Sequence, residues 1–144
     1  MIETLVYFEN KKHPWTKQAI GKIATEAGRF EPKISGAVEV HLVGDARIRK
    51  LNKQYRGIDK PTDVLSFAWK EDPGYQGALL GQIYMSVPYI ERQAKRFNVS
   101  AKEEFVRMLV HGLLHIVGYD HMKDKEAKQM FSLQEKIVLR ACRF

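Results

Sequence analysis

An α+β fold, close to the α/β type, is predicted by two features of the sequence. Strand-like and helix-like segments alternate in the order strand, helix, strand, helix, strand, strand and three helices. One of the late helices is apolar nearly all round, which is typical of a helix at the centre of a domain. We therefore expect a small mixed sheet of about four strands covered by about five helices, with one buried helix at the centre.

The chain is expected to be a single domain over residues 1–144, long enough to build a core without cross-links. Period-two alternation and short apolar runs predict the strands, and apolar residues at helical spacing predict the helices. The predicted strands cover residues 5–8, 37–43, 64–69 and 82–86. The predicted helices cover residues 13–28, 46–55, 87–97, 101–117 and 124–142.

Residues that favour helix ends mark several of these boundaries. Pro14 suits the first turn of the first helix, and Gly28 suits its carboxyl end. Asp45 is expected to cap the second helix and Ser86 the third. Ser100, followed three residues later by a glutamate, forms a capping-box pattern before the central helix.

The central helix carries His111 and His115 in its second half. Residues at positions i and i+4 lie on one face of a helix, with Cβ atoms roughly 6 Å apart. Two imidazoles at this spacing can bind one metal ion at about 2.0–2.1 Å. Gly118 is expected to end the helix, because glycine tolerates the left-handed conformation that reverses the chain. His121 can then fold back towards the pair.

Three histidines predict an open metal site of the catalytic kind. Structural zinc sites usually have four protein ligands, often thiolates, whereas Cys142 is the one cysteine of this chain. Three neutral imidazoles leave a position for water, whose pKa falls to about 7 on zinc. Zn²⁺ is expected, although other transition metals also suit imidazole. The alternative is packed or hydrogen-bonded core histidines. The other two histidines, His13 and His41, are expected to be structural or exposed.

Metzincin metalloproteases have the same histidine spacing, with a glutamate directly after the first histidine as general base. Here that position is Gly112, which has no proton-accepting group. Glu104 lies on the histidine face two turns earlier, too far along the helix to replace it easily. Peptide cleavage is therefore disfavoured, and a metalloprotease-like hydrolase without its base is kept as an alternative.

The net charge of +7 is concentrated in one half of the chain. Between Lys11 and Lys60 there are 12 lysines and arginines against five acids, which favours a polyanionic partner; a solvated basic face is the alternative. No segment approaches the roughly 18 apolar residues of a membrane span, and the amino terminus does not resemble a signal peptide. A lone cysteine fits a reducing compartment. We expect a cytoplasmic protein with no membrane and no disulfide partner.

Two blocks of the sequence resemble the YbeY-type rRNA maturation factors, which are bacterial metal-dependent endoribonucleases. The first block is HGLLHIVGYDH, residues 111–121, and the second is LNKQYRGIDKPTDVLSF, residues 51–67. The order of elements and the charge pattern match as well, so the resemblance covers nearly the whole chain.

The resemblance implies a zinc site at His111, His115 and His121, and a functional arginine that falls on Arg56. It also implies cleavage of single-stranded RNA, maturation of the 3′ end of 16S rRNA and ribosome quality control, with the small ribosomal subunit as partner. One position departs from the family, because Gln82 stands where an acidic residue is expected after the glycine. If that acid contacts the metal or the substrate in the family, this role is in doubt here; a structural place at the strand edge is the alternative.

RNA cleavage needs a group that binds the phosphate and groups that orient the metal ligands. Arg56 can bind the phosphate through two hydrogen bonds and stabilise the charge that grows in the transition state; pairing with Asp59 or Asp63 is the alternative. Asp120 and Asp63 are candidates for carboxylates that orient a ligand histidine, with turn roles as the alternative.

Further RNA contacts are expected from the basic half. The candidate phosphate-binding lysines are Lys50, Lys53 and Lys60. Four aromatic residues can stack on unpaired bases: Tyr55, Phe67, Trp69 and Tyr84. At these spacings, aromatic residues more often belong to the core.

We predict a zinc-dependent endoribonuclease with His115 and Arg56 as catalytic residues. The second hypothesis is a metal-stabilised, RNA-binding ribosome assembly factor with little catalysis. The attacking group, water or the 2′-hydroxyl of the RNA, is left open.

Overall fold

The computed structural model describes residues 1–10, 12–120, 122 and 124–143, and its elements follow the predicted order. The strands are β1 (Ile2–Phe8), β2 (Gly36–Val43), β3 (Val64–Phe67) and β4 (Leu79–Ser86). The helices are α1 (Lys17–Phe30), α2 (Asp45–Arg56), the short 3-10 helix η1 (Trp69–Glu71), α3 (Val87–Arg96), α4 (Ala101–Ile116) and α5 (Asp124–Ala141). The predicted α+β class is confirmed.

One mixed sheet contains the four strands in the order β1-β2-β4-β3. β1 pairs with β2 and β2 with β4 in parallel, whereas β3 pairs with β4 antiparallel. Parallel neighbours need a crossover connection, which α1 provides between β1 and β2. The short β3 therefore forms one edge of the sheet, and it lies close to α4.

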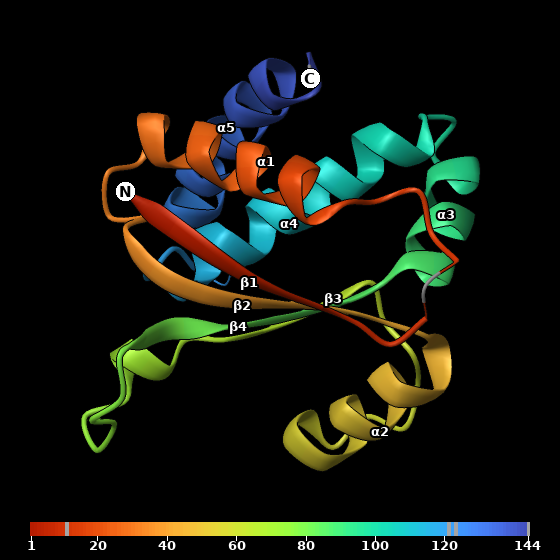
Figure 1. The fold of residues 1–144 in the computed structure, drawn as a ribbon, viewed down its shortest axis with the longest axis horizontal. Helices are drawn as coiled ribbons and strands as arrows, with labels where there is room; N and C mark the ends of the chain where they lie inside the picture. The colour runs from red at the N-terminus through yellow and green to blue at the C-terminus, as the bar shows by residue number, and fades with distance from the viewer. Residues whose placement is uncertain (11, 121, 123, 144) are drawn as a thin grey trace.

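The two faces of the sheet are covered unequally (Figure 1). Helices α1, α4 and α5 lie on one face, and α2 lies on the other. The main core lies between the sheet and the first group of helices, and α4 contributes many of its fully buried side chains. A smaller cluster on the α2 side contains Val43, Ile48, Leu65 and Phe67. The apolar circumference of α4 is thus explained by its central position.

Three predicted helix ends were wrong. α1 begins after Thr16, whose hydroxyl accepts from the Ala19 N–H, rather than at Pro14, and it continues through Gly28 to Phe30. α2 is capped by Gly44, and Asp45 is its first residue.

The carboxylate of Asp45 instead accepts from the Ser86 hydroxyl at 2.8 Å and from Arg92 at 2.7 Å. Those partners come from the end of β4 and from α3, so local sequence gives no signal for them. The predicted caps at Ser86 and Ser100 are confirmed, since their hydroxyls accept from the N–H groups of Tyr89 and Glu103. Within the described residues, no helix has the length and apolar character needed to cross a membrane.

Candidate metal and RNA site

A cleft of about 840 Å³ lies along one side of α4. Its walls come from α3, α5 and β3, and Arg56 at the end of α2 borders it. A second hollow of about 400 Å³ shares Arg56, Ser66 and His115 with the cleft and extends towards η1. The histidine end of α4 and Arg56 therefore lie between two connected hollows.

His111 and His115 both line the cleft, as their spacing predicts. Their ring centroids are 4.7 Å apart, and the ring planes are inclined by 77°. The rings are partly buried on the α4 face that is not covered by the main core. The predicted common face of the two histidines is confirmed.

Gln134 of α5, which the sequence analysis missed, holds one of these rings. Nδ1 of His111 lies 2.8 Å from Oε1 of Gln134. An amide oxygen can only accept, so Nδ1 of His111 donates to it, and in the neutral ring the lone pair that can ligate a metal is on Nε2. Gln134 is almost completely buried, and its Nε2 donates to Glu135 at 3.2 Å. The ring is thus fixed from the helix that follows the histidine segment.

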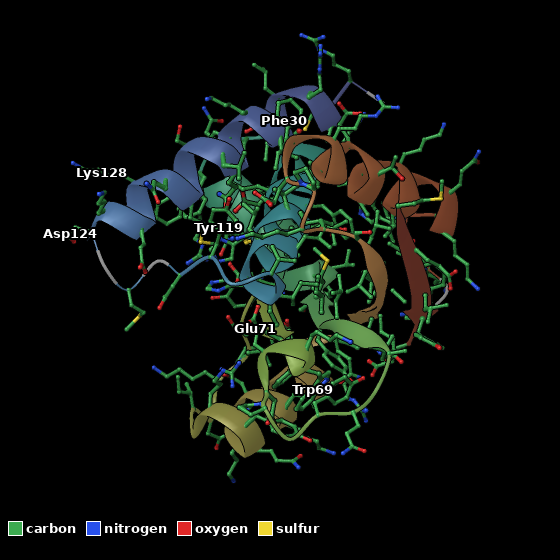
Figure 2. All side chains as sticks on the ribbon, turned by 90° about the vertical axis from the view of Figure 1, so that its left-hand side faces the viewer. Phe30, Trp69, Glu71, Tyr119, Asp124 and Lys128 are labelled. Atoms are coloured by element: carbon green, nitrogen blue, oxygen red, sulfur yellow. The ribbon has the colours of Figure 1, made fainter. Side chains whose placement is uncertain are left out.

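The turn after α4 is anchored to Glu31, at the carboxyl end of α1. Gly118 has φ +101°, the left-handed conformation predicted for the residue that reverses the chain. The hydroxyl of Tyr119 then donates to Oε2 of Glu31 at 2.6 Å, and this bond raises the pKa of Tyr119 to about 12. Figure 2 shows Tyr119 on the same side of the molecule as Glu71 of η1. His121, the third predicted ligand, lies outside the described residues.

Gly112 faces the sheet rather than the cleft. A Cβ atom at this position would lie 3.1 Å from both Cγ2 of Ile83 and Oγ of Ser66, a tighter contact than side chains normally make. A glutamate here would therefore require the Ile83 and Ser66 side chains to shift by a few tenths of an ångström. Glu104 does line the cleft, but it is 1% exposed and paired with Arg107 at 2.9 Å. Neither position offers the general base of a metalloprotease.

Arg56 extends from the end of α2 to β3. Its guanidinium donates to the backbone carbonyl of Ser66 at 3.0 Å and lies over the Phe67 ring, 5.1 Å from the centroid. The predicted alternative, a pair with an aspartate, is not found among the described residues. Asp59 pairs with Arg49 at 2.8 Å, and Asp63 bonds to other groups. Arg56 is exposed and oriented by neutral partners, so its charge is not cancelled by a carboxylate.

The other end of the cleft contains a network of acidic and amide side chains. Nε2 of Gln93 donates to Glu104 at 2.6 Å and to Asp63 at 3.1 Å. Arg107 pairs with Glu104 and also with Glu103 and Glu135 on either side. These hydrogen bonds raise the pKa of Arg107, and the one to Glu135 has the largest effect. The same bond lowers the pKa of Glu135. The one arginine here is thus neutralised by three carboxylates.

The remaining predicted site residues lie elsewhere or bond differently. The carboxylate of Asp120 accepts from the Met122 N–H at 2.9 Å, which is the turn role left open above. Asp63 lines the cleft, yet its recorded partners are Gln93, Thr62 and the Val64 N–H rather than a histidine. The three predicted phosphate-binding lysines are exposed and do not border the cleft; they are Lys50, Lys53 and Lys60.

Gln82 lies on the opposite face of the sheet from the cleft. It accepts from the indole N–H of Trp69 at 2.8 Å and donates to Glu39 at 2.9 Å. Glu39 also bonds to His41 at 2.8 Å, and the bonds from Gln82 and His41 together lower its pKa. The structural role considered for this position is therefore the one that the geometry supports.

The aromatic residues considered for base stacking form contacts within the fold. Phe67 is buried in the small cluster, and the rings of Tyr55, Trp69 and Tyr84 pack around it. The predicted core role is confirmed for Phe67, whereas Tyr55 is 48% exposed, and Trp69 and Tyr84 are partly buried, with Trp69 also bordering the smaller hollow. His13 accepts from the Trp15 N–H and stacks on Phe8, which is the expected structural role.

The donor set of the cleft fits a transition-metal ion. Two imidazoles share one face, and the hydrogen bond from His111 to Gln134 selects the tautomer that metal ligation needs. Among the described residues, no group of three histidine, cysteine, aspartate or glutamate side chains could hold a metal ion. His121 remains the predicted third ligand.

Comparison with known proteins supports the same family. The family described as "Endoribonuclease YbeY" matches residues 5–141. Endoribonuclease YbeY of a Sulfurihydrogenibium species is 43% identical over 95% of this chain and 88% of its own length. Endoribonuclease YbeY of Persephonella marina is 42% identical over 85% of this chain and 79% of its own length.

A solved structure agrees with these sequence matches. The solution structure of TM1509 from Thermotoga maritima superimposes with a TM-score of 0.65 and 32% sequence identity. The match covers 98% of this chain and 89% of that one. With its histidine pair, its turn at Gly118 and its arginine beside β3, the chain belongs to the endoribonuclease YbeY family.

Proposed function

We propose that this chain is a metal-dependent endoribonuclease that cleaves single-stranded RNA, in the 3′-end maturation of 16S rRNA and in ribosome quality control. The observation that carries the proposal is the location of His111, His115 and Arg56 around one cleft, in a chain of this family. The small ribosomal subunit is the proposed partner, and ribosomal RNA processing would take place in the cytoplasm.

The metal ligands in this proposal are His111, His115 and His121. Zn²⁺, when bound, would act as a Lewis acid towards the scissile phosphate and would lower the pKa of bound water. Gln134 keeps the His111 ring oriented by accepting from Nδ1 at 2.8 Å. The bond from Tyr119 to Glu31 holds the turn that leads to His121.

Arg56 has the properties of a phosphate-binding residue. The Ser66 carbonyl and the Phe67 ring hold the guanidinium on one side, and the group is otherwise exposed at the junction of the two hollows. A guanidinium keeps its charge throughout the physiological pH range and can donate two parallel hydrogen bonds to phosphate oxygens. Arg56 would thus position the phosphate and stabilise the negative charge that develops during cleavage.

The test is cleavage of a labelled single-stranded RNA by purified protein, with and without a chelator, followed by addition of Zn²⁺. Cleavage should disappear with the chelator and return with the metal. Metal-replete protein that cleaves no better than its His115→Ala variant would contradict the nuclease proposal. RNA binding without cleavage would then favour the assembly-factor hypothesis. A casein digest tests peptide cleavage, which the packing of Gly112 against Ile83 argues against.

A further inference from the structure

We propose that the end of the cleft away from Arg56 binds one unpaired nucleobase of the RNA strand, and that this base carries an exocyclic amino group. This inference rests on the proposed function, because it assigns a part of the substrate to a part of the same cleft. It concerns the region bordered by Phe97, Met108, Asp63 and Gln93, with Phe131 between this region and His111.

The cleft is longer than a metal and a phosphate require. Glu104 and His115 both line it, and they are eleven residues apart on α4. At 1.5 Å per residue, this separation is about 16 Å along the helix. Since Arg56 and His115 lie at one end, the remaining length is available for a nucleotide next to the bound phosphate.

Two aromatic rings with large exposed areas border the cleft. Phe97, at the end of α3, is 62% exposed. Phe131 of α5 is 45% exposed and stacks on the His111 ring, with centroids 6.3 Å apart, so it lies between this end and the histidines. Met108 and Val99 add apolar surface to the same cleft. Exposed aromatic rings beside a nucleic-acid site bind unpaired bases by stacking, which every base can do through its π-face.

The charges at this end are unsuited to phosphate but suited to an amino group. Arg107 is paired with three carboxylates, so its charge is not available to a ligand. Asp63 is partly exposed, and its recorded bonds come from Gln93, Thr62 and the Val64 N–H. Because a carboxylate has about four acceptor sites, it can accept one further hydrogen bond. An exocyclic amino group of adenine, cytosine or guanine would supply this donor; uracil has no such group and would have to present its ring N3–H instead.

The buried polar side chains of the cleft are held by hydrogen bonds within the fold before any ligand binds. Gln93, Glu104 and Gln134 are 7%, 1% and 4% exposed, and each is hydrogen-bonded to a neighbour. Preorganised acceptors of this kind lower the cost of ordering the site on binding. The cleft is therefore divided into a cationic end for the phosphate and an acidic, aromatic end for the base.

The experiment uses the zinc-loaded protein and short 2′-O-methyl oligonucleotides that electrophoresis shows to remain intact. Each oligonucleotide carries one abasic nucleotide, moved along the strand, and binding is measured by fluorescence anisotropy. We expect one position at which the abasic residue weakens binding by about 5- to 150-fold, the range typical of one stacked base. Uracil at that position should also bind more weakly than cytosine. Equal losses at all positions overturn the base site, and equal binding of cytosine and uracil overturns the role of the amino group.

Variants locate the effect. In the Phe97→Ala protein, and more strongly in Phe97→Ala/Phe131→Ala, the intact and abasic strands should bind with similar affinity. Leu139→Ala, which removes a 71% exposed side chain outside the cleft, is the matched control and should keep the difference. Asp63→Asn should reduce the preference for cytosine over uracil. Persistence of the abasic effect in the double variant would overturn the assignment.

A fluorescent base gives a readout that needs no variant. 2-Aminopurine at the sensitive position should lose fluorescence on binding to the wild-type protein, and unchanged fluorescence would contradict stacking. The two proposals fail differently. A wild-type protein that binds no RNA overturns both, whereas strong RNA binding with a flat abasic series overturns the base site alone and leaves the proposed nuclease function intact.

Discussion

His41 and His111 have similar hydrogen bonds and different surroundings. Each ring has one nitrogen held by a side-chain oxygen at 2.8 Å. In His41 this nitrogen is Nε2, and its partner is the carboxylate of Glu39. In His111 it is Nδ1, and its partner is the amide of Gln134. In His41 the hydrogen bond therefore occupies Nε2, the nitrogen far from the backbone. In His111 it occupies Nδ1 and thereby orients Nε2.

The ring faces differ as well. His41 is stacked between Tyr7 and Tyr84, with centroid distances of 4.8 and 4.4 Å. His111 has His115 at its edge and the Phe131 ring stacked on one face, with centroids 6.3 Å apart, and it lines the cleft. The comparison teaches that the choice of nitrogen and the access to the ring, more than the presence of a hydrogen bond, separate a structural histidine from a candidate ligand.

The largest effect is expected for His115→Ala, which removes a predicted metal ligand. RNA cleavage should fall below detection, and elemental analysis should show less bound zinc. His41→Gln is the control on the other face of the sheet and should keep cleavage within about twofold of wild type, because ring contacts there do not reach the cleft. If both variants cleave equally, the distinction between the two histidines is wrong.

Arg56→Ala should reduce the rate of RNA cleavage by about 10²–10³-fold, the effect typical of losing one group that stabilises developing charge. Arg56→Lys should recover only a part of this loss, because an ammonium group lacks the planar pair of donors. The measurement is single-turnover cleavage at saturating zinc. Arg49→Ala, which removes an arginine paired with Asp59 instead, should have little effect.

Gln134→Leu should weaken zinc binding by about 10- to 100-fold, because the acceptor that orients His111 is lost. Gln134→Glu keeps an acceptor for Nδ1 and should retain most of the affinity. Competition with a chromophoric chelator measures the affinity directly. Equal affinities of the Leu and Glu variants would show that the bond at His111 does not orient the metal ligand.

Tyr119→Phe tests the anchor of the turn through the pH dependence of stability. The bond to Glu31 raises the pKa of Tyr119 to about 12 from its ordinary value of 10. A raised pKa means that the folded state holds the proton more tightly, so this stabilisation is present below pH 10 and is lost as the pH rises towards 12. The free energy of unfolding of the wild type should fall over this range. The variant should be less stable at pH 8 and should lack this part of the decline.

Gln82→Asp restores the acid that the family resemblance implies, and should have the smallest effect. Its carboxylate would replace the donor to Glu39 with a like charge, which should destabilise the fold by about 1 kcal/mol. The pKa of Glu39 is lowered in the folded protein chiefly by Gln82, so this contribution is present above pH 4.5 and declines in acid. Denaturant unfolding at pH 7 and pH 4 measures both effects. Cleavage should stay at the wild-type rate, and a changed rate would connect this face of the sheet to the site.

Much of the fold could be predicted because it depends on patterns within single segments. The order of elements, the central helix, the histidine face and the reversal at Gly118 follow from periodicity, spacing and the conformational freedom of glycine. The resemblance of two blocks to a known family then identified Arg56. The missed helix ends at Gly28 and Asp45 were decided instead by packing and by side-chain partners from distant segments.

The sequence by itself therefore determined which residue types are available for chemistry and on which helix face they lie. The tertiary structure decided which partner each of them has. Gln134 is 23 residues from His111, and Ser66 is 10 residues from Arg56, so these hydrogen bonds exist only because α5 and β3 pack beside the cleft. The physical reason is that a hydrogen bond depends on distance and direction in space, whereas a sequence pattern records only separation along the chain.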